Sequence, residues 1–428
     1  MPPHNPALQQ LIEPRYSSAA IEKIRAVLLE HGTLHFSPLP NGLFSAGPIK
    51  RISAHTGYQA VWVRDNVHIA HALMETGDLT AATATVLALA DFFGRQASRF
   101  DAIIANPSRA AVPEERPHVK FNGYPLSEIP DWPHDQNDAL GYFVWIFARL
   151  ARLGHIAVTR THATLLARFP AYFDAIRFWS DEDSGHWEEI RKNSASSIGV
   201  VCAGCRELKA LLESDRGTEL RSFVAPDTID ALVDKGLERL GQILPFECIQ
   251  EPPQQRRYDA ALIFLVYPLA IVDTAVADQI IDDVQRHLQG EYGIRRYLGD
   301  SFWCTDYRRN MHTEERTRDF SSDMWTRDRF FAAGSEAQWC IFDPVISVIF
   351  GRRYQVAGDE RWLDNQIEYF NRALSQITAG YQCAELWHWE TAEDGQRSLE
   401  PSDVTPLLWT QANLRIALAE MMKSVANS

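Results

Sequence analysis

The chain has 428 residues and a formal charge of −14 at pH 7, a length that allows two or three domains or one large fold. Hydrophobic residues make up 46%, charged residues 23% and aromatic residues 11%, which excludes fibrous, low-complexity and extended disordered chains. Because no cluster of lysine and arginine interrupts the acidic excess, nucleic acid is not an expected partner.

The cysteines and the apolar segments indicate the compartment in which the protein is expected. The six cysteines lie mostly in apolar segments, which favours reduced thiols over a disulfide framework. The apolar runs stop short of the roughly 20 residues that cross a bilayer, and the amino-terminal residues lack the pattern of a cleaved signal peptide. We therefore expect a cytoplasmic protein with no membrane partner.

Apolar residues at three- and four-residue spacing predict twelve helices and almost no strand. The links between these helices alternate between short and long, so that successive helices form hairpins. The predicted helices lie near 18–31, 60–76, 79–97, 137–153, 159–179, 195–214, 228–244, 258–270, 276–289, 336–357, 361–378 and 406–423.

Six helical hairpins in a row predict an all-α fold, an (α/α)6 toroid in which one set of helices lines the centre and the other wraps it. A superhelical repeat array is the alternative, but the unequal loops and the lack of a shared repeat sequence favour the closed ring. We expect one domain over 18–428, preceded by a disordered or loosely attached segment at 1–17. The long loops should emerge at one end, where binding and catalytic residues gather.

Polar and aromatic residues cluster in the long loops or in the first turn of the following helix. The clusters are VWVRDN (61–66), HVKFNG (118–123), WPHDQNDA (132–139), GHWEE (185–189), YGIRRYLGDSFW (292–303), EAQWCIFD (336–343) and AELWHWE (384–390). Rings beside carboxylates and amides suit a sugar, whose C–H faces pack on aromatics while its hydroxyls need polar partners. The expected sugar-binding side chains of these clusters include Trp62, Lys120, Trp132, His134, Gln136, Asp138, Trp187, Trp339 and Trp387.

Carboxylates in two of these clusters could serve glycoside hydrolysis, which needs one carboxylic acid and one carboxylate. Glu188 and Glu189 follow Trp187, and Glu385 precedes two further tryptophans. The alternative for Glu188 and Glu189 is that they complement the dipole at a helix N-terminus. For Glu188 we favour a catalytic role. For Glu385 taken in isolation, a purely structural role is favoured.

Arg64 and Asp65 lie within an otherwise apolar stretch. A buried ion pair is a weak stabilising device because desolvation offsets the attraction, so a clamp for ligand hydroxyls is the better interpretation. Asp138 could be part of a helix cap, but His134 and Gln136 just before it favour a polar lining.

Motifs for metals and cofactors are incomplete. The segment that begins at Asp181 resembles a calcium loop but places His186 where glycine is required. Cys202 and Cys205 match CxxC, yet they lie inside a predicted helix with no second pair. The sequence has no HExxH, GxSxG, GxGxxG or P-loop motif, and we expect no metal and no cofactor.

The ordered set of motifs resembles the glucoamylases of glycoside hydrolase family 15. Within that family it is most similar to the glucoamylase-like domains of phosphorylase kinase regulatory subunits and their bacterial relatives. The resemblance runs from about residue 55 to about residue 420 and is carried by HWEE followed by NSASSIGVVCAGCRELKAL, by YGIRRYLGDSFW and by EAQWCIFDPVISVIFG.

The resemblance implies an (α/α)6 toroid that hydrolyses α-linked glucosides with inversion. Matched motif by motif, Glu188 would be the general acid and Glu385 the general base, with carboxyl groups roughly 6.5–9.5 Å apart. The residues implied to surround the terminal sugar are Trp62, Arg64, Asp65, Trp132, Glu189, Arg296 and Trp409.

Three functions remain open at this stage. The first is an inverting hydrolase of a small α-glucoside or oligosaccharide. The second is a non-catalytic carbohydrate-sensing or regulatory domain, which the resemblance to kinase subunits permits. The third keeps the toroid but acts on another sugar or another linkage.

Overall fold

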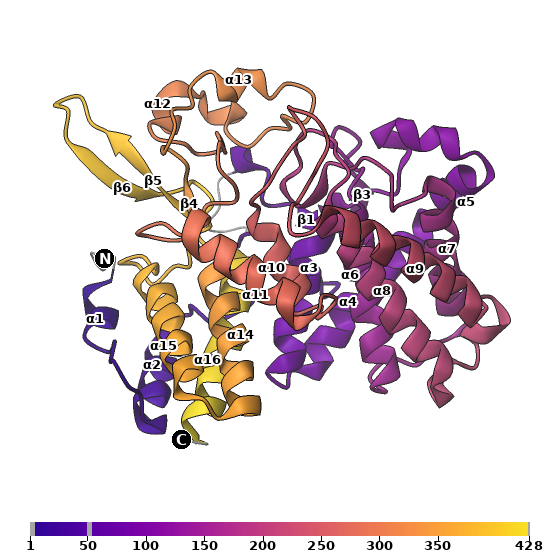
Figure 1. Cartoon of the computed structure of the whole chain (residues 1–428), viewed down its shortest axis with the longest axis horizontal. Helices are drawn as coiled ribbons and strands as arrows, with labels where there is room; N and C mark the ends of the chain where they lie inside the picture. Colours follow the sequence, from indigo (N-terminus) through magenta and orange to yellow (C-terminus); the bar gives the residue numbers. More distant parts are fainter. Residues whose placement is uncertain (1–4, 49–53, 427–428) are drawn as a thin grey trace.

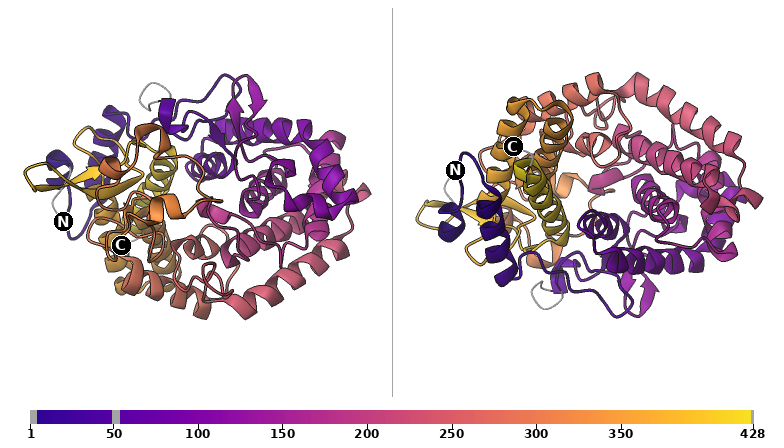
Figure 2. Two further views of the ribbon diagram at one scale, coloured as in Figure 1. Left: turned by 90° about the horizontal axis from the view of Figure 1, so that it is seen from above. Right: turned by 90° about the horizontal axis from the view of Figure 1, so that it is seen from below.

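The inner layer of the fold consists of helices that are buried almost all round, in the part of the chain that the structure describes, residues 5–48 and 54–426. The protein is described by a computed structural model, in which these helices are α3 (Val63–Glu75), α6 (Asn137–Arg152), α8 (Ala195–Glu213), α10 (Ile263–Val266), α14 (Phe342–Ala357) and α16 (Leu408–Ala426). Each packs on the next and α16 packs on α3, which closes a ring (Figure 2).

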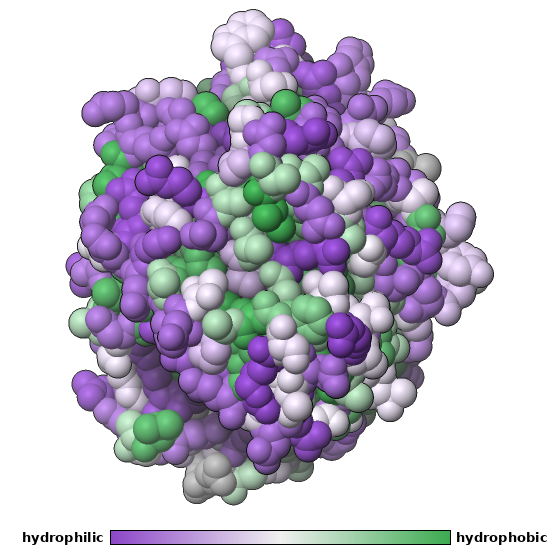
Figure 3. Space-filling model, turned by 90° about the vertical axis from the view of Figure 1, so that its right-hand side faces the viewer, coloured by the Kyte–Doolittle hydropathy of each residue, from purple (hydrophilic) through white to green (hydrophobic). Residues whose placement is uncertain are grey.

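An outer layer of amphipathic helices covers this ring. These helices are α2 (Ser18–Glu30) on α16, α4 (Leu79–Arg95) on α3, α7 (Arg160–Ile176) on α6, α9 (Pro226–Ile243) on α8, α11 (Thr274–Asp283) on α10 and α15 (Glu360–Ser375) on α14. Each turns one stripe of apolar side chains inward, and the face on the side of α5, α7 and α9 is mostly hydrophilic (Figure 3). The arrangement confirms the predicted (α/α)6 toroid.

Two of the twelve predicted helices are much shorter than expected. The segment at 258–270 forms a single 3-10 turn and the four-residue α10, because the chain leaves the helix before Pro268. The segment at 336–357 becomes helical only at Phe342. A further helix, α5 (Ala97–Ala105), lies in what the sequence predicts to be a loop, directly after α4.

Strands are few and short, as expected, and in the described part of the chain they form two three-stranded antiparallel sheets. One is formed by β1 (Val61–Trp62), β2 (Lys120–Gly123) and β3 (Leu126–Glu128). The other is formed by β4 (Gln338–Trp339), β5 (Leu386–Thr391) and β6 (Arg397–Pro401). Strands of two to six residues are too short to show a clear alternation of polar and apolar side chains.

The amino-terminal segment packs on the ring over the residues that are described. Its short helix α1 (Pro6–Gln9) contacts α15, and Leu8 is fully buried. The Asn5 side-chain amide donates to the carbonyl of Thr378 at 3.1 Å, and the Tyr16 hydroxyl donates to Asn371 at 2.6 Å. Residues 5–17 are therefore docked rather than loosely attached, whereas residues 1–4 of the predicted segment and 427–428 of the predicted domain lie outside the described residues.

A long insertion lies over the end of the ring at which the loops emerge. It comprises residues 304–335, which we call the cap segment, and contains the single-turn helices α12 (Tyr307–Asn310) and α13 (Trp325–Asp328) (Figure 1). Among the described helices, none combines the length and apolar composition that crossing a bilayer requires.

Glycines allow α6 and α8 to approach each other closely. A Cβ added at Gly204 of α8 would lie 2.6 Å from the carbonyl oxygen of Gly141 in α6, closer than carbon and oxygen can pack. The inner ring therefore depends on the absence of a side chain at this contact.

Replacing Gly204 by alanine tests this contact. The variant Gly204→Ala should lower the free energy of unfolding by about 1–3 kcal/mol, because the backbones must move apart. The control is Gly241→Ala in α9, where an added Cβ meets no atom within 4 Å and where helix propensity favours alanine by up to about 1 kcal/mol. Urea denaturation measures both, and equal effects would contradict close packing as the reason for Gly204.

Candidate active site

A pocket opens at the loop end of the ring, beneath the cap segment. The sequence-predicted residues that line it come from the start of α3, from four loops, from β4 and from α16. They are Trp62, Arg64, Asp65, Trp132, Trp187, Glu188, Arg296, Trp339, Glu385 and Trp409.

Arg64 lies in the first turn of α3, buried at the pocket wall. Its guanidinium donates to Asp138 at 2.6 Å, to Gln136 at 2.9 Å and to the carbonyl of Gly185 at 3.1 Å, and it pairs with Glu188 at 3.5 Å. Burial alone would raise the pKa of Asp138, but the adjacent Arg64 holds that pKa below its usual range. Asp138 and Gln136, predicted to bind sugar, do not line the pocket and instead orient Arg64.

Glu188 follows a 3-10 turn, Gly185–Trp187, and has a left-handed backbone with φ of 57° and ψ of 47°. This conformation is uncommon for a residue with a side chain and is a feature of functional sites. Burial raises the pKa of Glu188, and the nearby cations Arg64 and Lys120 only partly oppose the shift. The carboxyl group therefore favours its protonated form more than an exposed glutamate does.

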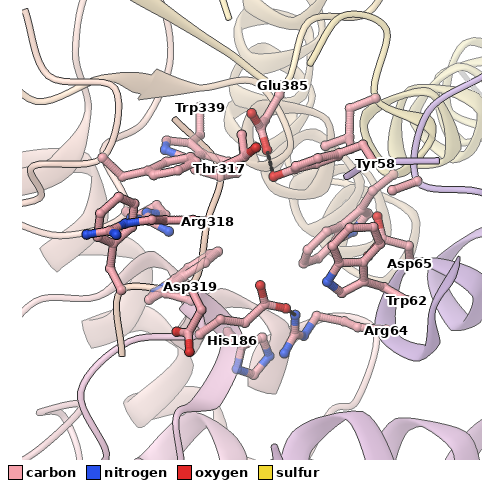
Figure 4. Close-up of a pocket in the computed structure, with 18 of the residues that line it drawn as sticks. Tyr58, Trp62, Arg64, Asp65, His186, Thr317, Arg318, Asp319, Trp339 and Glu385 are labelled. Carbon is pink, nitrogen blue, oxygen red and sulfur yellow. Dashed lines mark hydrogen bonds and ion pairs between the residues drawn. The ribbon is translucent and has the colours of Figure 1, made fainter. Parts of the chain in front are cut away.

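Glu385 precedes β5 and is 1% exposed. The Tyr58 hydroxyl donates to its carboxylate at 2.8 Å and the Ser402 hydroxyl at 3.1 Å. Burial raises the pKa of Glu385 to about 8, although these two hydrogen bonds lower it. Glu385 and Arg64 lie on opposite sides of the pocket (Figure 4). Since Glu188 pairs with Arg64, the two glutamates approach the pocket from different sides.

Asp65 and aromatic side chains complete the deep part of the pocket. Burial raises the pKa of Asp65 to about 7 despite the adjacent Arg64. The rings of Trp62 and Trp132 meet edge to face, with centroids 5.9 Å apart. A pocket that combines such rings with carboxylates and a guanidinium offers both the apolar faces and the polar partners that a sugar needs.

Glu189 lies behind the pocket wall in an arginine cluster and does not reach the pocket. Its carboxylate accepts from Arg296 at 2.9 Å and from Tyr297 at 2.6 Å, and it also pairs with Arg327 and Arg256. Although burial alone would raise the pKa of Glu189, these guanidinium groups lower it. Its contribution is to hold Arg296 and Arg327, both of which line the pocket.

Three other predicted residues also lie outside the lining. The Lys120 ammonium is 3.2 Å from the ring centroid of Trp132 and 4.3 Å from that of Trp62, so it supports two pocket rings from behind. His134 lies in the loop between β3 and α6, with its Nε2 2.7 Å from the carbonyl oxygen of Ile129. Trp387 points away from the pocket and donates to the carbonyl of Gln376 at 3.0 Å.

Several pocket residues were missed at the sequence level. Some lay inside or next to recognised clusters, so that their proximity was a usable signal. Others belong to the cap segment, where a charged run resembles an ordinary solvated surface. The missed residues are Ala46, Tyr58, His186, Phe302, Thr317, Arg318, Asp319, Phe320, Arg327 and Leu407.

Solved structures place this architecture among the glycosidases. A wild-type glycosidase superposes with a TM-score of 0.64 at 18% identity, covering 97% of this chain and 98% of that chain. The glucoamylase of Saccharomycopsis fibuligera superposes with a TM-score of 0.62 at 12% identity, covering 97% and 98%. At these identities the similarity establishes the class of fold, which is that of the glucoamylases.

The family follows from the sequence itself. The model of glycosyl hydrolases family 15 matches residues 32–333, well over half of the chain, and the chain belongs to this family.

Two curated relatives carry descriptions other than hydrolase. A probable phosphorylase b kinase regulatory subunit alpha of Caenorhabditis elegans is 24% identical over 393 residues, which cover 82% of this chain and 30% of that protein. The uncharacterized lipoprotein YgeQ of Escherichia coli is 27% identical over 202 residues, covering 42% of this chain and 76% of that protein. This chain thus spans less than a third of the kinase subunit that it matches.

The buried carboxyl of Glu385 should make the free energy of unfolding depend on pH. Its pKa is about 8 in the folded chain against 4.5 for an ordinary glutamate. The stability that this raised pKa contributes is therefore fully present below about pH 4.5 and is lost as pH rises through about 8. Relative to Glu385→Gln, the wild-type protein should lose stability over this interval with a slope of up to about 1.4 kcal/mol per pH unit.

Urea denaturation at a series of pH values measures this difference. The matched variant is Tyr58→Phe, which removes a hydrogen bond that lowers the Glu385 pKa and should move the loss to higher pH. A constant difference between the wild-type protein and Glu385→Gln from pH 4 to pH 9 would contradict the raised pKa.

Proposed function

We propose that this protein is an inverting glycoside hydrolase that acts on a small α-glucoside or oligosaccharide. The observation that carries the proposal is that Glu188, paired with Arg64, and Glu385 line one pocket from different sides. Inversion needs two carboxyl groups that face each other across the scissile bond and a water molecule. Membership of glycosyl hydrolases family 15 supports the same chemistry.

Glu188 is the general acid in this proposal. Its raised pKa favours the protonated form, from which it can give a proton to the leaving oxygen. Arg64, 3.5 Å away, then stabilises the carboxylate that forms. The buried position of the pair strengthens this interaction, because few water molecules remain to screen it.

Glu385 is the general base, which takes a proton from the attacking water. The donors Tyr58 and Ser402 fix its orientation and stabilise its ionised form against the burial that raises its pKa to about 8. Arg64 and Asp65 can grip hydroxyls of the terminal sugar, while Trp62, Trp132 and Trp409 offer apolar faces, a combination expected of a site for one sugar ring.

Replacing either glutamate by glutamine should strongly lower turnover. Glu188→Gln and Glu385→Gln should each lower kcat by about 10²–10⁴-fold, the usual contribution of general acid or base catalysis. Maltose, isomaltose, trehalose, kojibiose, nigerose and maltooligosaccharides serve as substrates, and NMR follows the anomer of the released glucose. The wild-type protein should release β-glucose.

The exposed Glu393, in the turn between β5 and β6, provides the matched control. Glu393→Gln carries the same substitution outside the pocket and should retain wild-type kcat. Release of α-glucose, or full activity of either carboxylate variant, would contradict the assignment.

The donors to Glu385 provide a second test through the pH profile. The variants Tyr58→Phe and Ser402→Ala each remove a hydrogen bond that lowers the Glu385 pKa. The ascending limb of kcat/KM against pH, which reports deprotonation of the base, should therefore move to higher pH in both. A limb that keeps its position while kcat falls would indicate that Glu385 is not the base.

Similarity to a phosphorylase kinase regulatory subunit favours a second candidate function, that of a non-catalytic carbohydrate-sensing domain. In that case the pocket binds sugar without turnover. Calorimetry that detects sugar binding, together with no release of glucose from any of the substrates above, would favour this function over hydrolysis.

A further inference from the structure

The pocket has a closed inner end and an outer end formed by the cap segment. Its lining residues on the ring helices, such as Asp65 and Trp409, are buried, whereas Arg318 is exposed and Asp319 is half-buried. In a hydrolase that removes a terminal sugar, this sugar occupies the closed end and the leaving group extends toward the opening. Arg318 and Asp319 therefore lie where the leaving group must pass.

The side chains of Arg318 and Asp319 can form further hydrogen bonds with a ligand. One oxygen of Asp319 accepts from the backbone of Ser321 at 2.7 Å. The Arg318 guanidinium contacts Asp323 at 3.3 Å through one nitrogen, an exposed pair that contributes little. A guanidinium only donates and a carboxylate only accepts, so the two together match neighbouring hydroxyls of a sugar.

The tip of the cap segment is held in place from both sides. Thr317 donates to the carbonyl of Thr56 at 2.8 Å, and the preceding Arg316 pairs with Asp403 at 2.8 Å. On the other side, Arg327 pairs with the buried Glu189. Because these contacts fix the backbone, Arg318 and Asp319 present their polar groups to the pocket without a large ordering cost.

The same anchors connect the cap segment to both glutamates of the proposed reaction. Asp403 follows Ser402, which donates to Glu385, and Glu189 follows Glu188. The Asp319 carboxylate is also close enough to Glu188 to contribute to its raised pKa. The cap tip therefore lies close to Glu188, the proposed general acid.

We propose that Arg318 and Asp319 bind the leaving group and select substrates in which it is a second sugar, over substrates with an apolar aglycone. The proposal rests on the hydrolytic function proposed above. An apolar aglycone would leave the charged groups of the cap tip without partners, whereas sugar hydroxyls would satisfy them.

The ratio of two kcat/KM values tests this proposal. One is for the best of the α-linked glucose disaccharides maltose, isomaltose, kojibiose and nigerose, and the other is for 4-nitrophenyl α-glucoside. In Arg318→Ala and Asp319→Asn the ratio of disaccharide to aryl glucoside should fall about 10-fold or more, as expected when a charged hydrogen-bonding partner is lost. Both side chains are partly exposed, so the variants should fold.

The control is Arg329→Ala, which removes an exposed arginine of the same cap segment that lies against Trp325 and outside the pocket. It should leave the ratio at the wild-type value. An unchanged ratio in Arg318→Ala and Asp319→Asn, with hydrolysis retained, would overturn the leaving-group site and leave the hydrolytic function intact.

A wild-type protein that hydrolyses no substrate would instead overturn the hydrolytic function. In that case calorimetry tests the leaving-group site by measuring the dissociation constants of disaccharide and of glucose and comparing their ratio. A loss of disaccharide preference of about 10-fold in Arg318→Ala supports the site, and an unchanged preference overturns it.

Discussion

The packing of α16 against α3 is the constraint on which the rest of the structure depends. It closes the ring, and with the ring closed the loops before α3, α8 and α16 meet at one end. Glu188 and Glu385, which are far apart in the chain, then share one pocket. Because inner helices are buried on nearly all sides, they form a rigid base from which polar side chains can be aimed with little loss of order.

Charge inside this apolar ring is tolerated where the buried ions have partners. Arg64 is satisfied by Asp138, Gln136 and a backbone carbonyl, and Glu189 is satisfied by three guanidinium groups. Such networks add little net stability compared with apolar packing. These networks instead fix the positions of the Arg64, Arg296 and Arg327 side chains at the pocket surface.

Glu188 and Glu385 differ from these structural carboxylates in their surroundings. Glu189 is held ionised by cations, whereas burial raises the pKa of Glu188 and Glu385. Opposite shifts in adjacent residues, Glu188 and Glu189, separate a carboxyl that can exchange a proton from one that cannot. Perturbed carboxyls at the wall of a cleft are characteristic of functional sites, and here they lie under a cap segment that approaches both of them.

Local sequence patterns determined the helical ring and half of the pocket lining, since apolar periodicity and clusters such as VWVRDN and GHWEE depend on residues close in the chain. Only the tertiary structure separated Glu188, in the pocket, from Glu189, behind it, and Arg64 from its supports Gln136 and Asp138. It also showed that Trp387 points away from the pocket and that Arg318 and Asp319 line it. The physical reason is that neighbours in sequence can face opposite sides of a wall, while the partners that orient them come from other parts of the chain.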